Sequence, residues 1–93
     1  DPSTTSRLLS RVREQERKSE EDAFRDLSDR ELEVLAEVAR GKTNIEIGKI
    51  LNLSEKTVRN YLSTVFEKLH LNNRIELATY AVEHHLFDKL GRE

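Results

Sequence analysis

The clearest hydrophobic pattern in the chain lies between residues 54 and 69. Ser54 is a residue type that caps helix N-termini, and the apolar positions after it are spaced as one stripe of a helix. This stripe comprises Val58, Leu62, Val65, Phe66 and Leu69. The opposite side of the same helix is polar, with Lys56, Arg59, Asn60 and Ser63. The pattern predicts a helix that packs along one side and exposes cations and an amide on the other.

A first short helix is predicted after residue 27. Ser28 and Glu31 have the spacing of a capping box. Leu27 is placed to pack across the same helix start against the first residue of the apolar stripe. This stripe comprises Leu32, Leu35, Ala36 and Ala39. Gly41 follows it and is typical of the residue after a helix end.

A second short helix begins at another capping box, formed by Thr43 and Glu46. Its apolar face is broad and comprises Ile45, Ile47, Ile50 and Leu51. Asn52 and Leu53 then form a short turn before the helix that Ser54 caps. Two short helices joined by a tight turn, the second with an exposed polar face, predict a helix-turn-helix.

A fourth helix is predicted to start at Asn73, with Glu76 three residues later at the N3 position, and to run to about Leu86. Apolar residues cover well over half of its circumference: Ile75, Leu77, Ala78, Tyr80, Ala81, Val82 and Leu86. One small domain cannot bury so wide an arc, so we expect a second contact. The simplest is the same helix of another copy, which would form a homodimer through Thr79, Tyr80 and Val82. The alternative is that an N-terminal helix of the same chain covers the arc with Leu8, Leu9 and Val12.

Every predicted element is helical, so the expected fold class is all-α. Residues 27–88 form the domain, residues 1–26 a linker and residues 89–93 a C-terminal tail. The linker starts with a predicted amphipathic helix over residues 3–18, and its charged remainder favours a solvated segment over residues 13–25. Because the chain begins with Asp1 rather than Met, we expect it to be a fragment of a longer protein.

The charge distribution favours local rather than general attraction of anions. The formal net charge of the 93 residues is −2, but residues 42–70 carry five basic and three acidic side chains. The chain has no Cys, which excludes disulfides and fits a reducing cytoplasm. Its apolar runs are shorter than a membrane span, and nothing resembles a signal peptide. We therefore expect a cytoplasmic protein without a membrane partner.

Several blocks of residues together resemble the LuxR/NarL-type helix-turn-helix domain. They are residues 27–35, 41–47, 53–61, 68–69 and 73–78, in this order. The resemblance covers residues 27 to about 86 and implies a four-helix, LuxR-type helix-turn-helix bundle. It also implies a DNA-binding output domain of a transcriptional response regulator. Gly48 stands where the family more often has Ala, and it allows close helix packing or weakens its helix by about 1 kcal/mol.

The same family resemblance implies a control mechanism. The domain is usually fused behind a receiver domain that a sensor kinase phosphorylates, and residues 1–9 resemble the helical linker that follows such a receiver. Residues 56–61 are similar to the dormancy-type (DevR-like) branch of the family. In that branch the residues matching Lys56, Arg59 and Asn60 approach bases.

Two sets of DNA contacts are expected from these patterns. Arg and Lys donate to guanine and Asn pairs with adenine, so the expected base contacts are Lys56, Arg59, Asn60 and Ser63. Helix N-termini and basic side chains attract phosphate, so the expected phosphate contacts are Lys42, Thr43, Asn44, Thr57 and Arg74. Lys56 reaches either a base or a phosphate. The alternative for Thr57 and Asn44 is local capping, and for Arg74 an intramolecular salt bridge.

No arrangement of a nucleophile with a base stands out, so we expect no enzyme, no catalytic residue and no cofactor. His70, His84 and His85 lack a metal-binding spacing and are expected to be surface residues rather than metal ligands. Two functions remain. The first is binding of double-stranded DNA, as a dimer on a pseudo-palindromic site. The second is a helical protein-interaction or sigma-region-four-like module that contacts the transcription machinery, which would need an apolar anchor on the outer face of helix 54–69.

Overall fold

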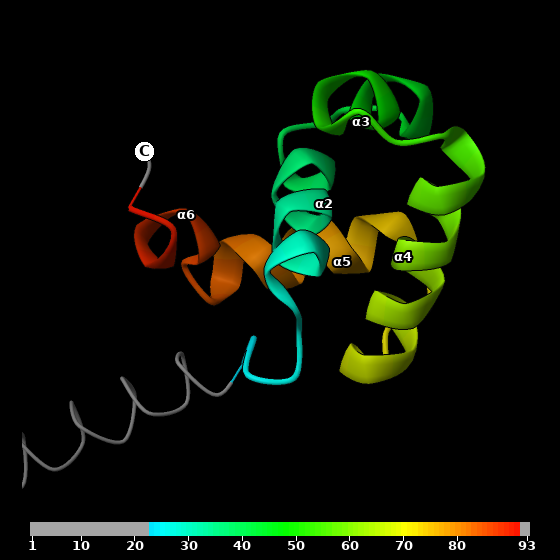
Figure 1. The fold of residues 1–93 in the computed structure, drawn as a ribbon. Coiled ribbons are helices and arrows are strands. Elements are labelled where there is room, and N and C mark those ends of the chain that lie inside the picture. The colour runs from blue at the N-terminus through cyan, green and yellow to red at the C-terminus, as the bar shows by residue number, and fades with distance from the viewer. Residues whose placement is uncertain (1–22, 92–93) are drawn as a thin grey trace, which may run out of the picture.

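The computed structural model describes residues 23–91, and this part of the chain contains five helices and no strand (Figure 1). The helices are α2 (Asp29–Ala39), α3 (Asn44–Leu51), α4 (Glu55–Leu69), α5 (Arg74–Glu83) and α6 (Leu86–Lys89). The predicted all-α fold class is confirmed. The linker helix predicted over residues 3–18, with Leu8, Leu9 and Val12, lies outside the described residues, as do residues 92–93 of the predicted tail.

Four of the helices begin at the capping residues that the sequence predicts. Both capping boxes are formed: the hydroxyls of Ser28 and Thr43 accept from the backbone N–H three residues later, and Glu31 and Glu46 accept from the cap residues in return. Ser54 and Asn73 cap α4 and α5 in the same way, without the reciprocal bond. Gly41, with φ of +86°, follows the end of α2. Local side-chain chemistry therefore fixes where these helices start.

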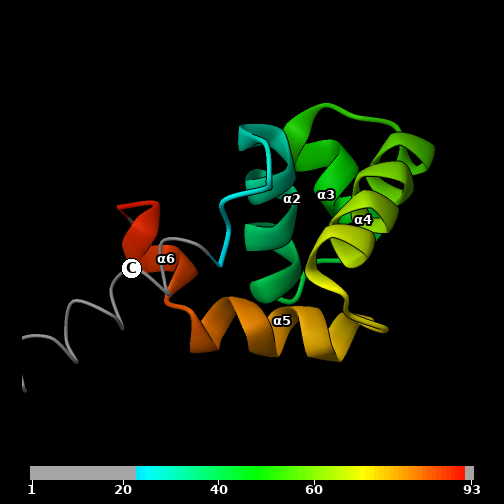
Figure 2. The ribbon, with the colours of Figure 1, turned by 90° about the horizontal axis from the view of Figure 1, so that it is seen from below.

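Helix α2 is the central helix of the described fold, and it packs against α3, α4 and α5. Figures 1 and 2 show α3 and α4 on one side of α2, and α5 crossing it. The stripe predicted for α2 was too narrow, because Val34 and Val38 are also buried. Both extra residues are covered because α2 has neighbours on several sides, which a one-sided helical pattern does not represent.

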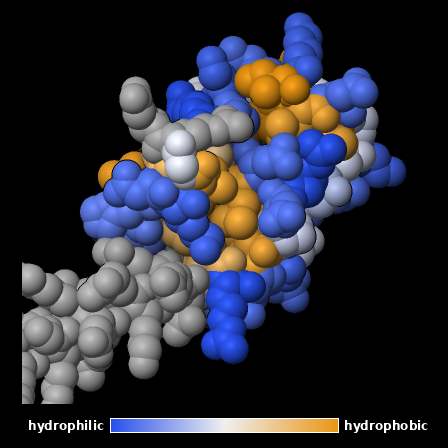
Figure 3. Space-filling model, turned by 60° about the vertical axis from the view of Figure 1, so that its left-hand side comes forward, coloured by the Kyte–Doolittle hydropathy of each residue, from blue (hydrophilic) through white to orange (hydrophobic). Residues whose placement is uncertain are grey.

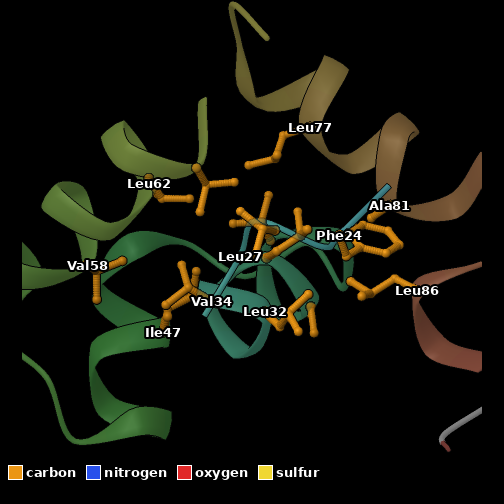
Figure 4. Close-up of a cluster of buried hydrophobic side chains, with 14 residues drawn as sticks. Phe24, Leu27, Leu32, Val34, Ile47, Val58, Leu62, Leu77, Ala81 and Leu86 are labelled. Carbon is orange, nitrogen blue, oxygen red and sulfur yellow. The ribbon is translucent and has the colours of Figure 1, made fainter. Parts of the chain in front are cut away.

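One hydrophobic core joins all five helices to the segment before α2 (Figure 4). Its residues in α3 and α4 are Ile47, Val58, Leu62 and Val65, and those in α5 and α6 are Leu77, Ala81 and Leu86. Phe24 contributes from before α2, with only 1% of its surface exposed. Its ring meets the ring of Tyr80 edge-on at 5.7 Å, and the Tyr80 hydroxyl donates to the Ala23 carbonyl at 2.7 Å. Packed structure therefore begins before Leu27, within the predicted linker.

The prediction of one continuous helix from Asn73 to about Leu86 was wrong at its end. Helix α5 ends at Glu83, and His85 takes a left-handed backbone conformation with φ of 55°. This turn lets Leu86 begin α6 and become fully buried. Leu90, in the predicted tail, also packs against the core. Apolar periodicity did not reveal the break, because His85 carries no strong signal for such a turn.

The predicted broad apolar face of α3 is only partly used for packing. Ile47 is fully buried, whereas Ile45 and Ile50 are exposed by 57% and 51%. A Cβ atom on Gly48 would lie 2.5 Å from the backbone oxygen of Leu53. Of the two predicted roles of Gly48, the structure therefore supports close packing, because the turn after α3 approaches its backbone directly.

Some large hydrophobic side chains remain exposed on the surface of the described residues. Figure 3 shows one face of the molecule, on which apolar surface lies between polar side chains. Over the described residues the large exposed hydrophobic side chains are Ile45, Ile50, Ile75 and Val82. Among residues 23–91, none of the helices has the length and apolar character that crossing a bilayer requires.

Candidate nucleic-acid interface

The outer face of α4 is polar along its length. The four predicted base-contact residues all lie on this helix and are all exposed: Lys56, Arg59, Asn60 and Ser63. The buried residues of the same helix are Val58, Leu62 and Val65, which belong to the hydrophobic core. Figure 4 shows Val58 and Leu62 among the core side chains. None of the large exposed hydrophobic residues of the described chain belongs to α4. The face can therefore donate and accept hydrogen bonds, but it lacks the apolar anchor that a protein-docking helix needs.

An ion pair on this face joins Arg59 to an acidic residue one turn earlier. The Nε atom of Arg59 lies 3.8 Å from Oε1 of Glu55, the first residue of α4. Both side chains remain largely exposed, at 61% for Arg59 and 49% for Glu55. The spacing of four residues, with the acid nearer the helix N-terminus, is the favourable order for an ion pair. That spacing is visible in the sequence and was the signal by which the pair could have been found.

An ion pair between an exposed lysine and a buried glutamate holds the other end of α4 to the start of α2. Lys68 Nζ lies 2.8 Å from Glu31 Oε1 and donates to the Asp26 carbonyl at 2.9 Å. Burial of Glu31 would raise its pKa, but hydrogen bonds from Lys68 and Ser28 outweigh burial and hold the pKa below the usual value. Glu31 is therefore both a helix cap and an anchor for α4. The sequence predicted only its role in the cap, because Lys68 is 37 residues away.

Three of the predicted phosphate contacts meet where α5 approaches the turn between α2 and α3. Arg74 Nη1 donates to Asn44 Oδ1 at 2.8 Å, and Arg74 Nη2 donates to the Lys42 carbonyl. The predicted alternative for Arg74, a salt bridge to an acidic residue, does not describe these bonds, because both acceptors are neutral oxygens. Two of the five N–H donors of Arg74 are thus used within the protein. Asn44 accepts through its oxygen, which leaves its amide donors for another partner.

The remaining predicted phosphate contacts, Thr43 and Thr57, lie at the starts of α3 and α4. Thr43 Oγ1 accepts from the Glu46 backbone N–H at 3.2 Å, so this hydroxyl is used in the cap. The Thr57 hydroxyl accepts from Ser54 Oγ at 2.9 Å. The hydrogen bonds from Thr43 hold the pKa of Glu46 below its usual value. Thr43 therefore caps α3, and the Thr57 hydroxyl is bonded to the cap of α4, so contact with phosphate would have to accommodate both bonds.

The outer face of α5 differs from that of α4 in its chemistry. Thr79 and Val82 are exposed, and Ile75 is exposed by 79%. Tyr80, the third predicted dimer residue, is only half-buried, and burial raises its pKa. Part of its ring is covered by Phe24 and by His84, whose ring centre is 4.3 Å away. The segment at residues 23–24 therefore occupies part of the arc that was expected to contact a second copy.

The histidines have positions in the fold that do not depend on a metal. His70 and His85 have left-handed backbone conformations at the end of α4 and the start of α6, and His84 packs against aromatic rings. Within residues 23–91, the structure contains no group of three His, Cys, Asp or Glu side chains that could hold a metal ion.

Comparison with known proteins gives one family. Residues 25–81 match the family described as bacterial regulatory proteins, luxR family. The chain is 38% identical over 88 residues to the transcriptional regulatory protein LiaR of Bacillus subtilis, covering 92% of this chain. It is 51% identical over 57 residues to the transcriptional regulatory protein DesR of the same organism, and 42% identical over 57 residues to the nitrate/nitrite response regulator protein NarP of Escherichia coli, each covering 61% of this chain. The chain spans only 42%, 29% and 26% of the length of these three relatives.

Proposed function

This chain belongs to the luxR family of bacterial regulatory proteins, and from this premise we propose that the outer face of α4 recognises a specific sequence of double-stranded DNA. The chain is a helix-turn-helix output domain of a DNA-binding transcriptional regulator. The family is one of transcription regulators rather than enzymes. The exposed set of Lys56, Arg59, Asn60 and Ser63, on a helix whose other side is buried, carries the proposal. These residue types match the donor and acceptor pattern of the major groove.

Phosphate contacts would fix the orientation of α4 on the duplex. Lys42, Asn44 and Arg74 lie together, and Thr43 and Thr57 lie at helix starts, where backbone N–H groups favour anions. Asn44 keeps its amide N–H donors for a phosphate, because Arg74 donates to its amide oxygen. Arg74 has further N–H donors for a phosphate beyond the two used within the protein.

Two copies would bind one pseudo-palindromic site. In this arrangement the exposed arc of α5, with Thr79, Val82 and the free part of Tyr80, contacts the same arc of a second copy. Two recognition helices would then enter successive major grooves about 34–36 Å apart. The exposure of Val82, at 61%, supports such a contact, because burial of apolar surface favours association.

We infer that this chain is part of a longer regulator. Because the curated relatives are more than twice its length, and one is named a response regulator, we place a receiver domain before residue 1. A sensor kinase would phosphorylate this receiver in the bacterial cytoplasm, and phosphorylation would promote dimerisation through α5. The similarity of residues 56–61 to the DevR-like branch makes a comparable set of base contacts part of this proposal.

The experiment that tests the central claim is selection of bound duplexes from a random pool, followed by mobility shifts at several salt concentrations. We expect one enriched motif with two half-sites. The logarithm of the affinity should fall with the logarithm of the salt concentration, by about 0.9 per neutralised phosphate.

Recovery of no motif, together with weak binding that is equal on all duplexes, would contradict sequence recognition. Binding to duplex that is insensitive to salt, together with capture of a polymerase subunit, would instead favour the sigma-region-four-like alternative.

A further inference from the structure

The recognition helix α4 carries an acidic residue, Glu55, in an ion pair with Arg59 on the face that we propose contacts DNA. This is unexpected, because DNA is a polyanion. Glu55 begins α4, directly before Lys56, and its carboxylate is half exposed. A negative charge next to DNA opposes general phosphate binding, so it weakens attraction that carries no sequence information. The helix N-terminus stabilises this charge in the free protein, since its backbone N–H groups favour anions. A helix that only needed to bind phosphate would be served better by an uncharged residue here.

The geometry of the pair also determines which part of Arg59 is available. The contact is on the Nε side of the guanidinium, at 3.8 Å, which is too long for a hydrogen bond and acts as an electrostatic contact. The two terminal nitrogens are not the atoms that make this contact, and they remain as donors for another partner. Together they can form two parallel bonds to guanine O6 and N7.

We propose that Glu55 is a specificity-determining positioning residue, which directs the guanidinium of Arg59 end-on toward a guanine and opposes its use as a phosphate contact. This inference rests on the proposed function, because it assigns a role in recognition of DNA by α4. Glu55 acts through Arg59 and does not itself need to contact a base. Its removal should therefore reduce discrimination between sequences more than it reduces binding.

The test compares Glu55→Gln with wild type on the selected duplex and on a random duplex, at two salt concentrations. Gln keeps the size of the side chain and removes the charge. The affinity for random duplex should rise, and the ratio of specific to random affinity should fall by about two- to fivefold, the range expected for an exposed ion pair. Repeating the selection with this variant should show a weaker guanine preference at the position that Arg59→Ala also weakens.

Glu33→Gln is the matched control. Glu33 is also a half-exposed carboxylate in an ion pair within one helix, at 3.2 Å from Arg30, but it lies on α2. The control changes the net charge equally and should leave the affinity ratio unchanged. A thermal unfolding curve for each variant verifies that the fold is retained.

A double-mutant comparison separates positioning of Arg59 from a direct effect of Glu55. In an Arg59→Ala background, Glu55→Gln should not change the affinity ratio further. Two outcomes would overturn the role assigned to Glu55 while leaving sequence recognition intact. In the first, Glu55→Gln lowers the ratio of specific to random affinity equally in the wild-type and Arg59→Ala backgrounds. In the second, the Glu55→Gln single variant keeps the wild-type ratio. If wild type itself fails to distinguish the selected duplex from random duplex, the proposed function fails, and the role of Glu55 fails with it.

Discussion

The outer faces of α4 and α5 are both exposed, but they leave different chemistry in contact with solvent. Helix α4 buries its aliphatic residues Val58, Leu62 and Val65 and exposes charged and amide groups. Helix α5 buries Leu77 and Ala81, and Ile75 and Val82 remain in solvent. A polar face on a firmly packed helix suits a polar ligand such as a duplex. The exposed apolar side chains of α5 suit contact with another apolar surface. The two faces therefore support different kinds of binding.

Helix α4 is anchored at both ends and in its middle, which holds its orientation fixed. Its first turn is capped by Ser54, its middle is buried in the core, and its last turn is tied to α2 through Lys68 and Glu31. Helix α5 is tied to the helix-turn-helix by Arg74 and to residues 23–24 by Tyr80. A change in the position of α5 would therefore reach the turn before α3, where we propose phosphate contacts, through Arg74.

The largest effect is expected from a substitution that disrupts the packing of α4 against the core. Leu62 is 5% exposed, and Leu62→Ala should lower the free energy of unfolding by about 2–5 kcal/mol through lost burial and a cavity. Val82→Ala, on the exposed arc of α5, should change the same quantity by less than about 0.5 kcal/mol. Urea unfolding followed by circular dichroism measures both. A loss for Leu62→Ala as small as that for Val82→Ala would show that the two faces are not anchored differently.

The next largest effect is expected when a polar side chain is removed from the outer face of α4 and the packing of the helix is left intact. Arg59→Ala should weaken binding to the selected duplex by about 1–3 kcal/mol, with a smaller loss on random duplex. Its stability should stay within about 0.5 kcal/mol of wild type, because the side chain is exposed. Lys89→Ala, which removes an exposed charge from α6, is the control. Equal losses on the two duplexes would assign Arg59 to a phosphate instead of a base.

A charge on the apolar arc tests the other face. Val82→Asp should keep the fold but abolish dimers in analytical ultracentrifugation. It should also weaken binding to a duplex with two half-sites by at least about tenfold, because the second half-site is no longer bound by a copy that is linked to the first. Affinity for one half-site should not change. Ile50→Asp places the same charge on an exposed isoleucine of α3 and should leave the dimer intact. A wild-type protein that stays monomeric, on DNA as well as free, contradicts the proposed contact.

The smallest effect concerns pH and the anchor of α4. Hydrogen bonds from Lys68 and Ser28 outweigh burial and depress the pKa of Glu31 below its usual 4.5. The ionised carboxylate therefore stabilises the fold fully above about pH 4.5, and this contribution is lost as the pH falls through the lower pKa of the folded state. Urea unfolding at pH 6 and pH 3 should show a decline in stability that is smaller in Glu31→Gln than in Glu33→Gln. Equal declines in the two variants would show that Glu31 is not responsible.

Much of this architecture could be predicted from local sequence patterns. The four caps act over three residues, so Ser28, Thr43, Ser54 and Asn73 fixed the helix starts from residue types alone. The helical spacing of the residues in α4 separated its buried side from its exposed side correctly. The Glu55–Arg59 pair has the same local origin and was predictable in principle. The assignments of base, phosphate and dimer contacts remain predictions until binding is measured.

Other features depended on contacts between residues that are distant in sequence. Phe24 is buried, and its ring packs against the rings of Tyr80 and His84 at the far end of the domain sequence. Arg74 becomes a link to Asn44 only because α5 crosses near the turn before α3. The break at His85 goes together with the burial of Leu86. The chain turns back toward the core at His85, and this turn places the Leu86 side chain there.

The sequence by itself therefore determined the starts of four helices and the polar face of α4, because capping and helical periodicity act within a few residues. The tertiary structure decided which surfaces stay exposed and which charged groups become anchors. Those outcomes depend on how whole helices pack, and a pattern along one helix contains no information about its neighbours.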